Sequence, residues 1–465
     1  MGRGRDSATS RKAQGPTFLS REEVAKHNTM GDAWVIVDGR VIDVSDWAEH
    51  PGGRVVFTVA GQDATDVFRG FHSPAAWEHL ATRQIGTVAP VEPSAFDKEV
   101  LELRKEFRKN GWFNASPFYY TYKTAEVLGI AAAGVFVLHS FPHNWFAVIG
   151  AALLLATAWQ QAGWLSHDFM HHQVFENRLG GDIMGLFLGN FIQGFSVDWW
   201  KNKHNTHHSI PNLHESEDDL HDGDPDIDTL PFLAWSTTMA DKARRDPSGW
   251  SAFFVRNQQM IFFPLLSFAR LTWAQQSIAY ALAPLLPETA RGGAWGGGRV
   301  APSLRYPVAE LVGLAAHYTV LLVLAYLYMT PIQAIAYFLT AQMVCGLMLA
   351  VSFVVGHNGM ECFDKADKPG FFELQLRATR NVTDDCIGFA GWFTGGLHLQ
   401  VEHHLFPTMP RHHLAKAAPI VEALCKKHGV RYHSQPLLVG VWEVLECLDV
   451  MAQPVIRALH EFPAM

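Results

Sequence analysis

Residues 145–172 read WFAVIGAALLLATAWQQAGWLSHDFMHH and join an apolar segment to a cluster of three histidines. A helix that crosses a bilayer needs about 20 mostly apolar residues, and residues 145–165 meet that requirement. His167 and His171 stand four residues apart, which places them on one face of a helix. The stretch therefore predicts a membrane helix that ends in a cluster of ligand-type side chains.

The same length and apolarity recur elsewhere, so that four membrane spans are predicted, at about 124–142, 145–165, 307–329 and 331–355. They form two pairs, joined by the short loops HSFPHNW and MTPIQ. Lysine and arginine are absent between Lys123 and Arg178 and between Arg305 and Lys365. By the positive-inside rule both short loops lie on the lumenal side, and the rest of the chain faces the cytosol.

The composition agrees with a membrane protein. Charged residues make up 18% and hydrophobic residues 48% of the 465 residues, against roughly 25% charged residues in a typical soluble domain. The net charge of −8 gives no support to nucleic-acid binding. The five cysteines include no CxxC pair, which indicates a reducing compartment. The polar, basic start has no apolar core, so we expect no signal peptide there.

Other stretches are less regular. Apolar segments at about 183–197 and 258–285 are broken by polar residues, which favours interfacial or re-entrant helices over further spans. The acidic stretch HESEDDLHDGDPDIDT, residues 214–229, is expected to be a solvated loop. The sequence RGGAWGGGR, residues 291–299, is typical of a flexible connector.

Two further histidine clusters are predicted on the same side of the membrane as the first. They are HNTHH, residues 204–208, and QVEHH, residues 400–404. Neutral imidazoles that face one pocket bind iron, copper or zinc, and three clusters supply more ligands than one tetrahedral ion takes. The pattern therefore predicts a two-metal site at the membrane surface, and the histidines alone would also permit zinc.

The candidate metal ligands are the cluster side chains and one histidine that ends the fourth span: His167, His171, His172, His204, His207, His208, His357, Gln400, His403 and His404. His172 points to another helix face than its neighbours, which leaves a hydrogen-bonding role open. Gln400 could ligate through its amide oxygen or hold a metal-bound water. Asp168 and Glu402 are candidate acceptors that orient imidazoles.

The N-terminal region carries a separate pattern. The strands WVIV and VIDV flank Asp38-Gly39, which is a strong hairpin signal. His50 opens the motif HPGG, and His72 follows an apolar stretch that contains GQDAT. Two imidazoles that bracket an apolar slot suit a haem with two axial histidines. This region resembles cytochrome b5, and the resemblance carries His50 and His72 over as axial ligands of haem b, with an interval slightly shorter than in soluble members.

The whole chain resembles the membrane-bound fatty acid desaturases, and most closely the front-end subgroup with a fused cytochrome b5. The resemblance rests on GWLSHDFMHHQVF, WWKNKHNTHHSIPNLH, DGDPDIDT and QVEHHLFPTMPRHHL, in which glutamine leads the third cluster. It implies a centre of two non-haem iron ions and electrons from an NADH-cytochrome b5 reductase. It also implies an endoplasmic reticulum membrane with both termini cytosolic, and it matches His357 to a ligand between the second and third clusters.

The resemblance further implies that O2 is the co-substrate and that a cis double bond forms between an existing one and the carboxyl end of an acyl chain. The text around the first two clusters is most similar to Δ6 enzymes that act on linoleoyl and α-linolenoyl chains. A Δ5 enzyme for 20-carbon chains and a sphingolipid long-chain-base Δ8 desaturase stay open, as does the choice between acyl-CoA and phospholipid-bound substrate. A non-catalytic membrane electron carrier would not explain three histidine clusters on one side.

The expected fold is mainly α, with a small α+β haem domain before a four-helix membrane domain and its cytosolic, histidine-rich cap. The predicted regions are a disordered N-terminus (1–16), the cytochrome b5-like domain (17–92), a linker with an amphipathic helix (93–120), the desaturase domain (121–440) and a cytosolic tail (441–465).

Overall fold

The computed structural model describes residues 17–47, 50, 52–72, 76–215, 223–286, 304–383 and 388–461. The chain divides into two compact units, one of Met1–Ala48 with Val59–Glu92 and the other of Glu49–Thr58 with Pro93–Met465. The predicted disordered N-terminus, the connector at 291–299, residues 216–222 of the acidic stretch and Cys386 lie outside the described residues.

The first unit is built on a five-stranded sheet with the order β1-β5-β4-β3-β2. Its strands are β1 (Thr17–Phe18), β2 (Asn28–Thr29), β3 (Asp32–Val37), β4 (Arg40–Asp43) and β5 (Gln84–Thr87). Helices α1 (Arg21–Lys26), α3 (Thr65–Phe71) and α4 (Ala76–Ala81) complete it. β1 pairs with β5 in parallel, and the other pairs are antiparallel.

The predicted hairpin is confirmed. Val37 pairs with Arg40 across a two-residue turn, and Asp38 and Gly39 both have positive φ, 54° and 73°. A turn of this kind matches the right-handed twist of the strands on either side, which is why Asp-Gly is favoured there. The core beneath the sheet contains Val24, Ile36, Val41 and Val88. The small α+β domain expected from the sequence is therefore present.

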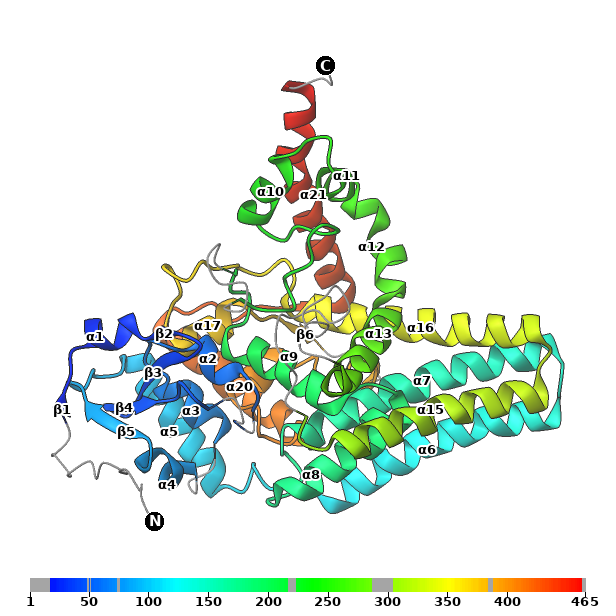
Figure 1. The fold of residues 1–465 in the computed structure, drawn as a ribbon, viewed down its shortest axis with the longest axis horizontal. Helices are drawn as coiled ribbons and strands as arrows, with labels where there is room; N and C mark the ends of the chain where they lie inside the picture. Colours follow the sequence, from blue (N-terminus) through cyan, green and yellow to red (C-terminus); the bar gives the residue numbers. More distant parts are fainter. Residues whose placement is uncertain are drawn as a thin grey trace, which may run out of the picture. The chain divides into compact units, whose positions relative to one another are not determined.

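Four long helices dominate the second unit and run side by side in Figure 1. They are α6 (Pro117–Ser140), α7 (Trp145–Met170), α15 (Pro307–Tyr328) and α16 (Pro331–His357). Within the described part of the chain, these are the helices long and apolar enough to cross a membrane, which confirms the four predicted spans. α7 and α16 continue beyond the predicted ends, to Met170 and His357, and the residues that extend them are buried.

Capping residues fix where these helices begin. Ser116, Asn144 and Thr330 each accept a hydrogen bond from a backbone N–H in the first turn of α6, α7 and α16. The two short loops lie at the same end of the helices, because the His143 N–H donates to Tyr328 O at 2.9 Å and Gln333 Nε2 donates to His143 O at 2.7 Å. The histidine-bearing ends of α7 and α16 therefore lie together at the opposite end.

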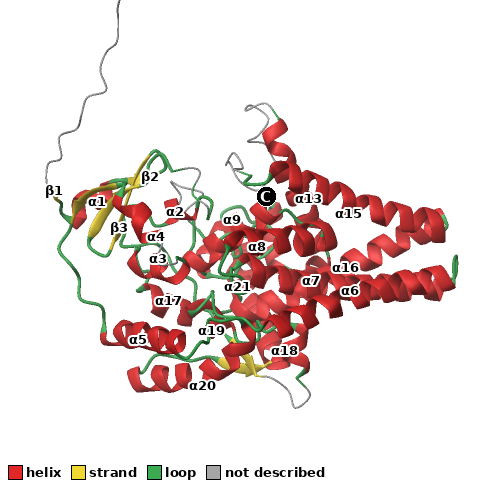
Figure 2. Cartoon of the chain, turned by 90° about the horizontal axis from the view of Figure 1, so that it is seen from below, coloured by secondary structure: helices red, strands yellow, loops and turns green. Residues whose placement is uncertain are grey.

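The other helices of the second unit range from three residues in η2 to 25 in α21, and several of them, among them α8, α9, α17 and α19, lie toward that opposite end (Figure 2). Along the chain they are α2 (Val55–Thr58), α5 (Ala95–Lys109), α8 (Arg178–Gly185), the π-helix η1 (Leu186–Gln193), α9 (Val197–Ser209), α10 (Thr237–Arg244), α11 (Trp250–Arg256), α12 (Gln258–Ser267), α13 (Ala269–Leu282), η2 (Ala283–Leu285), α17 (Phe371–Arg377), α18 (Phe389–Phe393), α19 (Gln400–Leu405), α20 (Arg411–His428) and α21 (Leu437–Glu461). Strands β6 (Asn381–Thr383) and β7 (Ser434–Pro436) pair in parallel.

The apolar stretches that fell short of a span form helices of moderate length. Residues 183–197 contain the end of α8, η1 and the start of α9, and residues 258–285 contain α12, α13 and η2. Helices α10, α11, α12 and α21 share one hydrophobic core that includes Trp235, Phe262, Val444 and Val455. The C-terminal residues 437–461 are thus a packed helix, and the boundary predicted at 441 falls inside it.

Candidate metal centre

The first histidine cluster sits at the end of α7. His167 lies in the last turn of the helix and His171 at its C-cap, and both are buried. Their spacing of four residues keeps them on one face, as the sequence predicts. The rings lie 4.5 Å apart between centroids. Helix α7 therefore delivers two imidazoles to one point without help from the rest of the chain.

Helix α9 carries the second cluster. Ser196 accepts a hydrogen bond from Trp199 N and so fixes the start of the helix. His204 and His208 are one turn apart and point to one side, and His207 lies between them on a neighbouring face. All three are buried. One helix thus supplies ligands to two different places.

Helix α19 is only one and a half turns long and carries Gln400, His403 and His404. Each of the three is buried. His357, at the end of α16, is buried beside them. The side chains from all four helices meet in two groups, which are named here the first and the second group.

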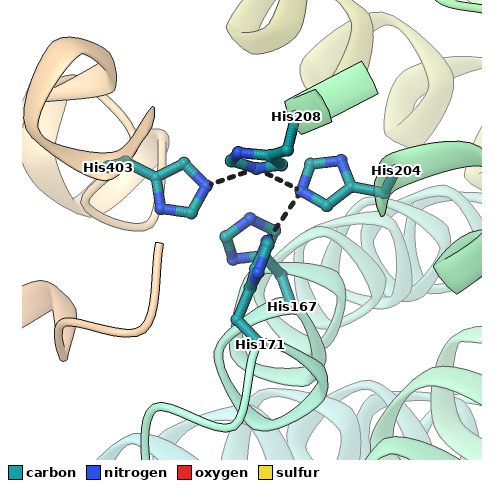
Figure 3. A group of neighbouring side chains, drawn as sticks. All are labelled: His167, His171, His204, His208 and His403. Atoms are coloured by element: carbon teal, nitrogen blue, oxygen red, sulfur yellow. Dashed lines mark hydrogen bonds between the residues drawn. The ribbon is translucent and has the colours of Figure 1, made fainter. Parts of the chain in front are cut away.

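The first group is formed by five histidines, His167, His171, His204, His208 and His403. One ring nitrogen of each lies within 4.8 Å of those of the other four. His204 Nε2 is 2.9 Å from His171 Nε2 and 3.0 Å from His208 Nε2, and His403 Nε2 is 3.0 Å from His208 Nε2. Figure 3 shows the five rings pointing toward one another.

The second group is formed by His207, His357 and His404, with Gln400 beside them. His207 Nε2 lies 3.3 Å from His357 Nε2, and Gln400 Nε2 lies 2.6 Å from the same His357 nitrogen. The other nitrogen of each ring is held from behind. His207 Nδ1 is 2.9 Å from Asp224 Oδ2, His357 Nδ1 is 3.2 Å from Ala378 O, and His404 Nδ1 is 2.8 Å from Gln375 Oε1.

Burial keeps most of these imidazoles neutral. Desolvation, together with the neighbouring imidazoles, lowers the pKa well below its ordinary value for His171, His204, His208, His403 and His404. His207 differs, because the charge and hydrogen bond of Asp224 outweigh burial and raise its pKa. A neutral imidazole offers a lone pair to a cation. The two groups are therefore electrostatically suited to bind metal ions.

The donor atoms fit two metal ions. Five imidazoles in one group exceed the four ligands of a structural zinc site, and the second group adds three more and an amide. Within the described residues, the buried atoms His167 Nε2, His404 Nε2 and Gln400 Oε1 have no hydrogen-bond partner. Buried polar atoms without a partner are costly in free energy. A bound cation at each group would remove that cost.

The structure brings together nine of the ten predicted ligand residues, counting Gln400 beside the second group, and places His172 outside both groups. His172 follows the end of α7 with a positive φ of 56°. Its Nδ1 lies beside Gly181 of α8. A Cβ atom at Gly181 would be 3.1 Å from this nitrogen.

Of the two predicted acceptors, Asp168 contacts a ligand and Glu402 does not do so directly. Asp168 Oδ1 is 3.3 Å from His167 Nδ1. Glu402 instead accepts hydrogen bonds from Asn381 Nδ2 and Tyr432 Oη, both at 2.8 Å. Burial raises the pKa of Glu402 to about 7. Glu402 therefore links α19 to β6 and to Tyr432, which precedes β7.

Sequence reasoning missed two residues that hold ligands. Asp224 belongs to the stretch expected to be a solvated loop, yet it is buried and also accepts a hydrogen bond from Asn212 N at 2.7 Å. That expectation was wrong for Asp224, because its carboxylate faces His207 rather than water. Gln375 lies in α17 with no histidine nearby in sequence. The motif DGDPDIDT signalled the first of these residues, and nothing signalled the second.

The two predicted haem ligands belong to different units. His72 Nδ1 is 3.0 Å from Phe68 O, and its ring stacks on Phe68. His50 Nδ1 lies 3.2 Å from Gly52 N and 3.3 Å from Gly53 O. In both rings backbone groups lie within hydrogen-bond distance of Nδ1.

Comparison with known proteins adds the family. Residues 143–436, more than half of the chain, match the model of the fatty acid desaturases, and residues 20–89 match the cytochrome b5-like haem/steroid binding domain. An acyl-lipid (9-3)-desaturase of Physcomitrium patens is 37% identical, over 93% of this chain and 78% of the relative. A Δ8-fatty-acid desaturase of Euglena gracilis is 35% identical, over 87% of this chain and 92% of the relative. The Δ6-fatty-acid desaturase fat-3 of Caenorhabditis elegans is 31% identical, over 90% and 96%.

Proposed function

The chain belongs to the front-end fatty acid desaturases that carry a fused cytochrome b5 domain, and we propose that it forms the Δ6 double bond of 18-carbon acyl chains. The proposed desaturase chemistry is supported by the two groups of buried histidines that meet at the ends of α7 and α16. The proposed Δ6 position is supported by the sequence around the first two histidine clusters and by the similarity to the Δ6-fatty-acid desaturase of Caenorhabditis elegans.

Two iron ions are the proposed occupants of the two groups. When bound, they would supply the O2-dependent oxidation that removes two hydrogens from an unactivated pair of methylenes. His167, His171, His204, His208 and His403 would hold one ion. His207, His357 and His404 would hold the other, with Gln400 as a further ligand or as the holder of a water. Overall, one O2, two electrons and two protons would convert the acyl chain to a cis alkene and two waters.

The chain's own residues keep the centre dry. Trp200 stacks on the ring of His204 at 4.3 Å and meets His167 edge-on at 5.6 Å. Below it, Trp159 and Trp164 are buried among apolar residues of α7 and α16. Burial of methylenes in such surroundings is favourable by about 0.8 kcal/mol each. We infer that the acyl chain, bound to CoA or to a lipid, lies against this apolar region.

The region of residues 20–89, which matches the cytochrome b5-like domain, is the proposed electron donor. A haem b held by His50 and His72 would pass on electrons one at a time, and an NADH-cytochrome b5 reductase would reduce it. Fusion in one chain raises the effective concentration of the donor. For the membrane, we propose the endoplasmic reticulum, with both termini cytosolic and the loops after α6 and α15 lumenal. The absence of Lys and Arg from these loops supports that orientation.

Feeding experiments in yeast that expresses the chain test the bond position. Linoleic, α-linolenic, dihomo-γ-linolenic and 11,14-eicosadienoic acids are supplied one at a time, and the fatty acid methyl esters are profiled. New Δ6 products from the 18-carbon acids are the expected result. Conversion of only the dihomo acid would assign Δ5, and conversion of only the eicosadienoic acid would assign Δ8, as named for the Euglena relative. Altered long-chain bases without new acyl products would assign the sphingolipid reaction.

A further inference from the structure

One segment contacts several candidate ligands although it contains none. It comprises residues 375–381, from the end of α17 to the start of β6, and is named here the orienting segment. Gln375, Ala378, Arg380 and Asn381 within it are buried. Each takes part in a hydrogen bond with a histidine-bearing helix, α9, α16 or α19. The sequence gives no reason to single it out.

Gln375 fixes His404. The amide Nε2 donates to the backbone carbonyl of His208 at 3.2 Å, and a carbonyl can only accept. The amide oxygen must therefore be the atom that faces His404 Nδ1, at 2.8 Å. An oxygen without a hydrogen requires Nδ1 to carry the proton. His404 Nε2 is thereby left with its lone pair, directed toward the second group.

Arg380 fixes the end of α16. Its backbone N–H donates to Gly356 O at 2.8 Å. Its guanidinium donates from Nε to Val355 O at 2.8 Å and from a terminal nitrogen to Asn358 O at 3.1 Å. These carbonyls flank His357, whose Nδ1 lies 3.2 Å from Ala378 O in the same segment. A cation at a helix C-terminus is also favoured by the helix dipole.

The segment is itself held in place. Arg380 forms an ion pair with Glu443 of α21, and His433 Nε2 lies 2.9 Å from the same carboxylate. Asn381 accepts a hydrogen bond from Val401 N of α19 at 2.8 Å and donates to Glu402. The segment thus connects α16, α19 and the C-terminal helix.

We propose that residues 375–381 are a positioning element of the second metal site, in which Gln375 sets the protonated nitrogen of His404 and Arg380 fixes the helix end that bears His357. The proposal rests on the proposed function, since it takes the second group to be a metal site. Neither side chain touches the metal. Loss of a partner that orients a metal ligand typically lowers metal affinity about 10–100-fold.

The test measures non-haem metal per haem in the purified full-length protein. It uses the variants Gln375→Leu and Arg380→Lys together with a chelator titration. Gln258→Leu is the matched control, because Gln258 is equally buried and also bonds backbone groups, Ala234 N at 2.8 Å and Leu448 O at 2.7 Å, in another part of the unit. Thermal unfolding is recorded for every variant.

The expected result is that Gln375→Leu keeps the haem and about one of two non-haem ions, and that the remaining site resists chelator as in wild type. Arg380→Lys should lower the chelator midpoint of one ion by about 10-fold. Gln258→Leu should lose stability but no metal. Wild-type metal content in both test variants would overturn the proposal, as would equal loss in the control. A wild-type protein with fewer than two non-haem ions would instead contradict the proposed function.

Discussion

The two histidine groups differ in how their imidazoles are held. In the second group each Nδ1 faces a separate holder, Asp224, Ala378 O or Gln375. In the first group four of the five histidines come as pairs one turn apart on α7 and α9, and the helices themselves aim the rings. The second group draws one histidine from each of α9, α16 and α19.

The comparison teaches that helix periodicity can build only part of such a centre. Pairs at i and i+4 are aligned by the backbone, so that the first group needs few outside contacts. Single ligands on separate elements need outside hydrogen bonds to fix ring orientation and tautomer. We therefore expect substitutions of the holders to lower metal affinity more in the second group than in the first.

The largest effect is expected when a ligand of the first group is removed. His204→Ala takes away an imidazole whose Nε2 lies 2.9 Å from His171 Nε2 and 3.0 Å from His208 Nε2, so desaturation should fall below detection. Haem content and reduction by NADH-cytochrome b5 reductase should stay as in wild type, because His50 and His72 are unchanged. The acyl profile and the haem spectrum are measured in the same membranes. Retained desaturation would mean that the first group is not catalytic.

The next effect concerns Asp168, a carboxylate that contacts the first-group ring of His167. Asp168 forms an ion pair with Arg411 and accepts from Tyr120 Oη at 2.9 Å, all buried. Arg411→Met leaves the carboxylate without its cation, and breaking a buried pair typically costs about 3–5 kcal/mol. Thermal unfolding of the purified protein should show a large drop in stability. An unchanged unfolding temperature would show that this ion pair does not stabilise the end of α7.

A smaller effect is expected for the carboxylate that holds a second-group ring. Asp224→Asn removes the charge beside His207 and should weaken metal binding about 10–100-fold, as measured by chelator titration. Asp226→Asn is the control. Asp226 is 34% exposed, and its carboxylate oxygen lies 3.6 Å from His207 Nδ1, which is too far for a hydrogen bond. If both variants bind metal equally well, Asp224 does not orient the ligand.

The smallest effect is expected at His172. It belongs to the first sequence cluster but lies outside both groups, so His172→Ala should keep two non-haem metal ions and most of the activity. The metal content and the acyl profile of the variant are compared with wild type. Loss of one ion would place His172 among the metal ligands and would contradict the membership of the first group.

Sequence patterns predicted most of the fold and the shared face of His167 and His171, because both depend on local periodicity. Length and apolarity gave the four helices, Asp38-Gly39 gave the hairpin, and the spacing of His167 and His171 gave a shared face. The holders of the second group were not predicted. Asp224 sits in an acidic stretch that looks solvated, and Gln375 is more than 20 residues from any ligand it supports. Only tertiary packing reveals contacts at such separations.

The orientation of His172 also lay beyond the sequence. A continued α7 would place it on another helix face, but the helix ends at Met170 and the chain turns through a positive φ at His172. Where a helix ends is set by packing as well as by its residues.

The most direct test of the central claim is the non-haem metal content of the purified wild-type protein, counted against its haem. Elemental analysis gives total iron and zinc, and the absorbance of the haem gives the number of chains. Two groups of ligands predict two non-haem iron ions per haem. A ratio of one or zero, or two zinc ions in place of iron, would contradict the assignment of the two groups to a di-iron centre.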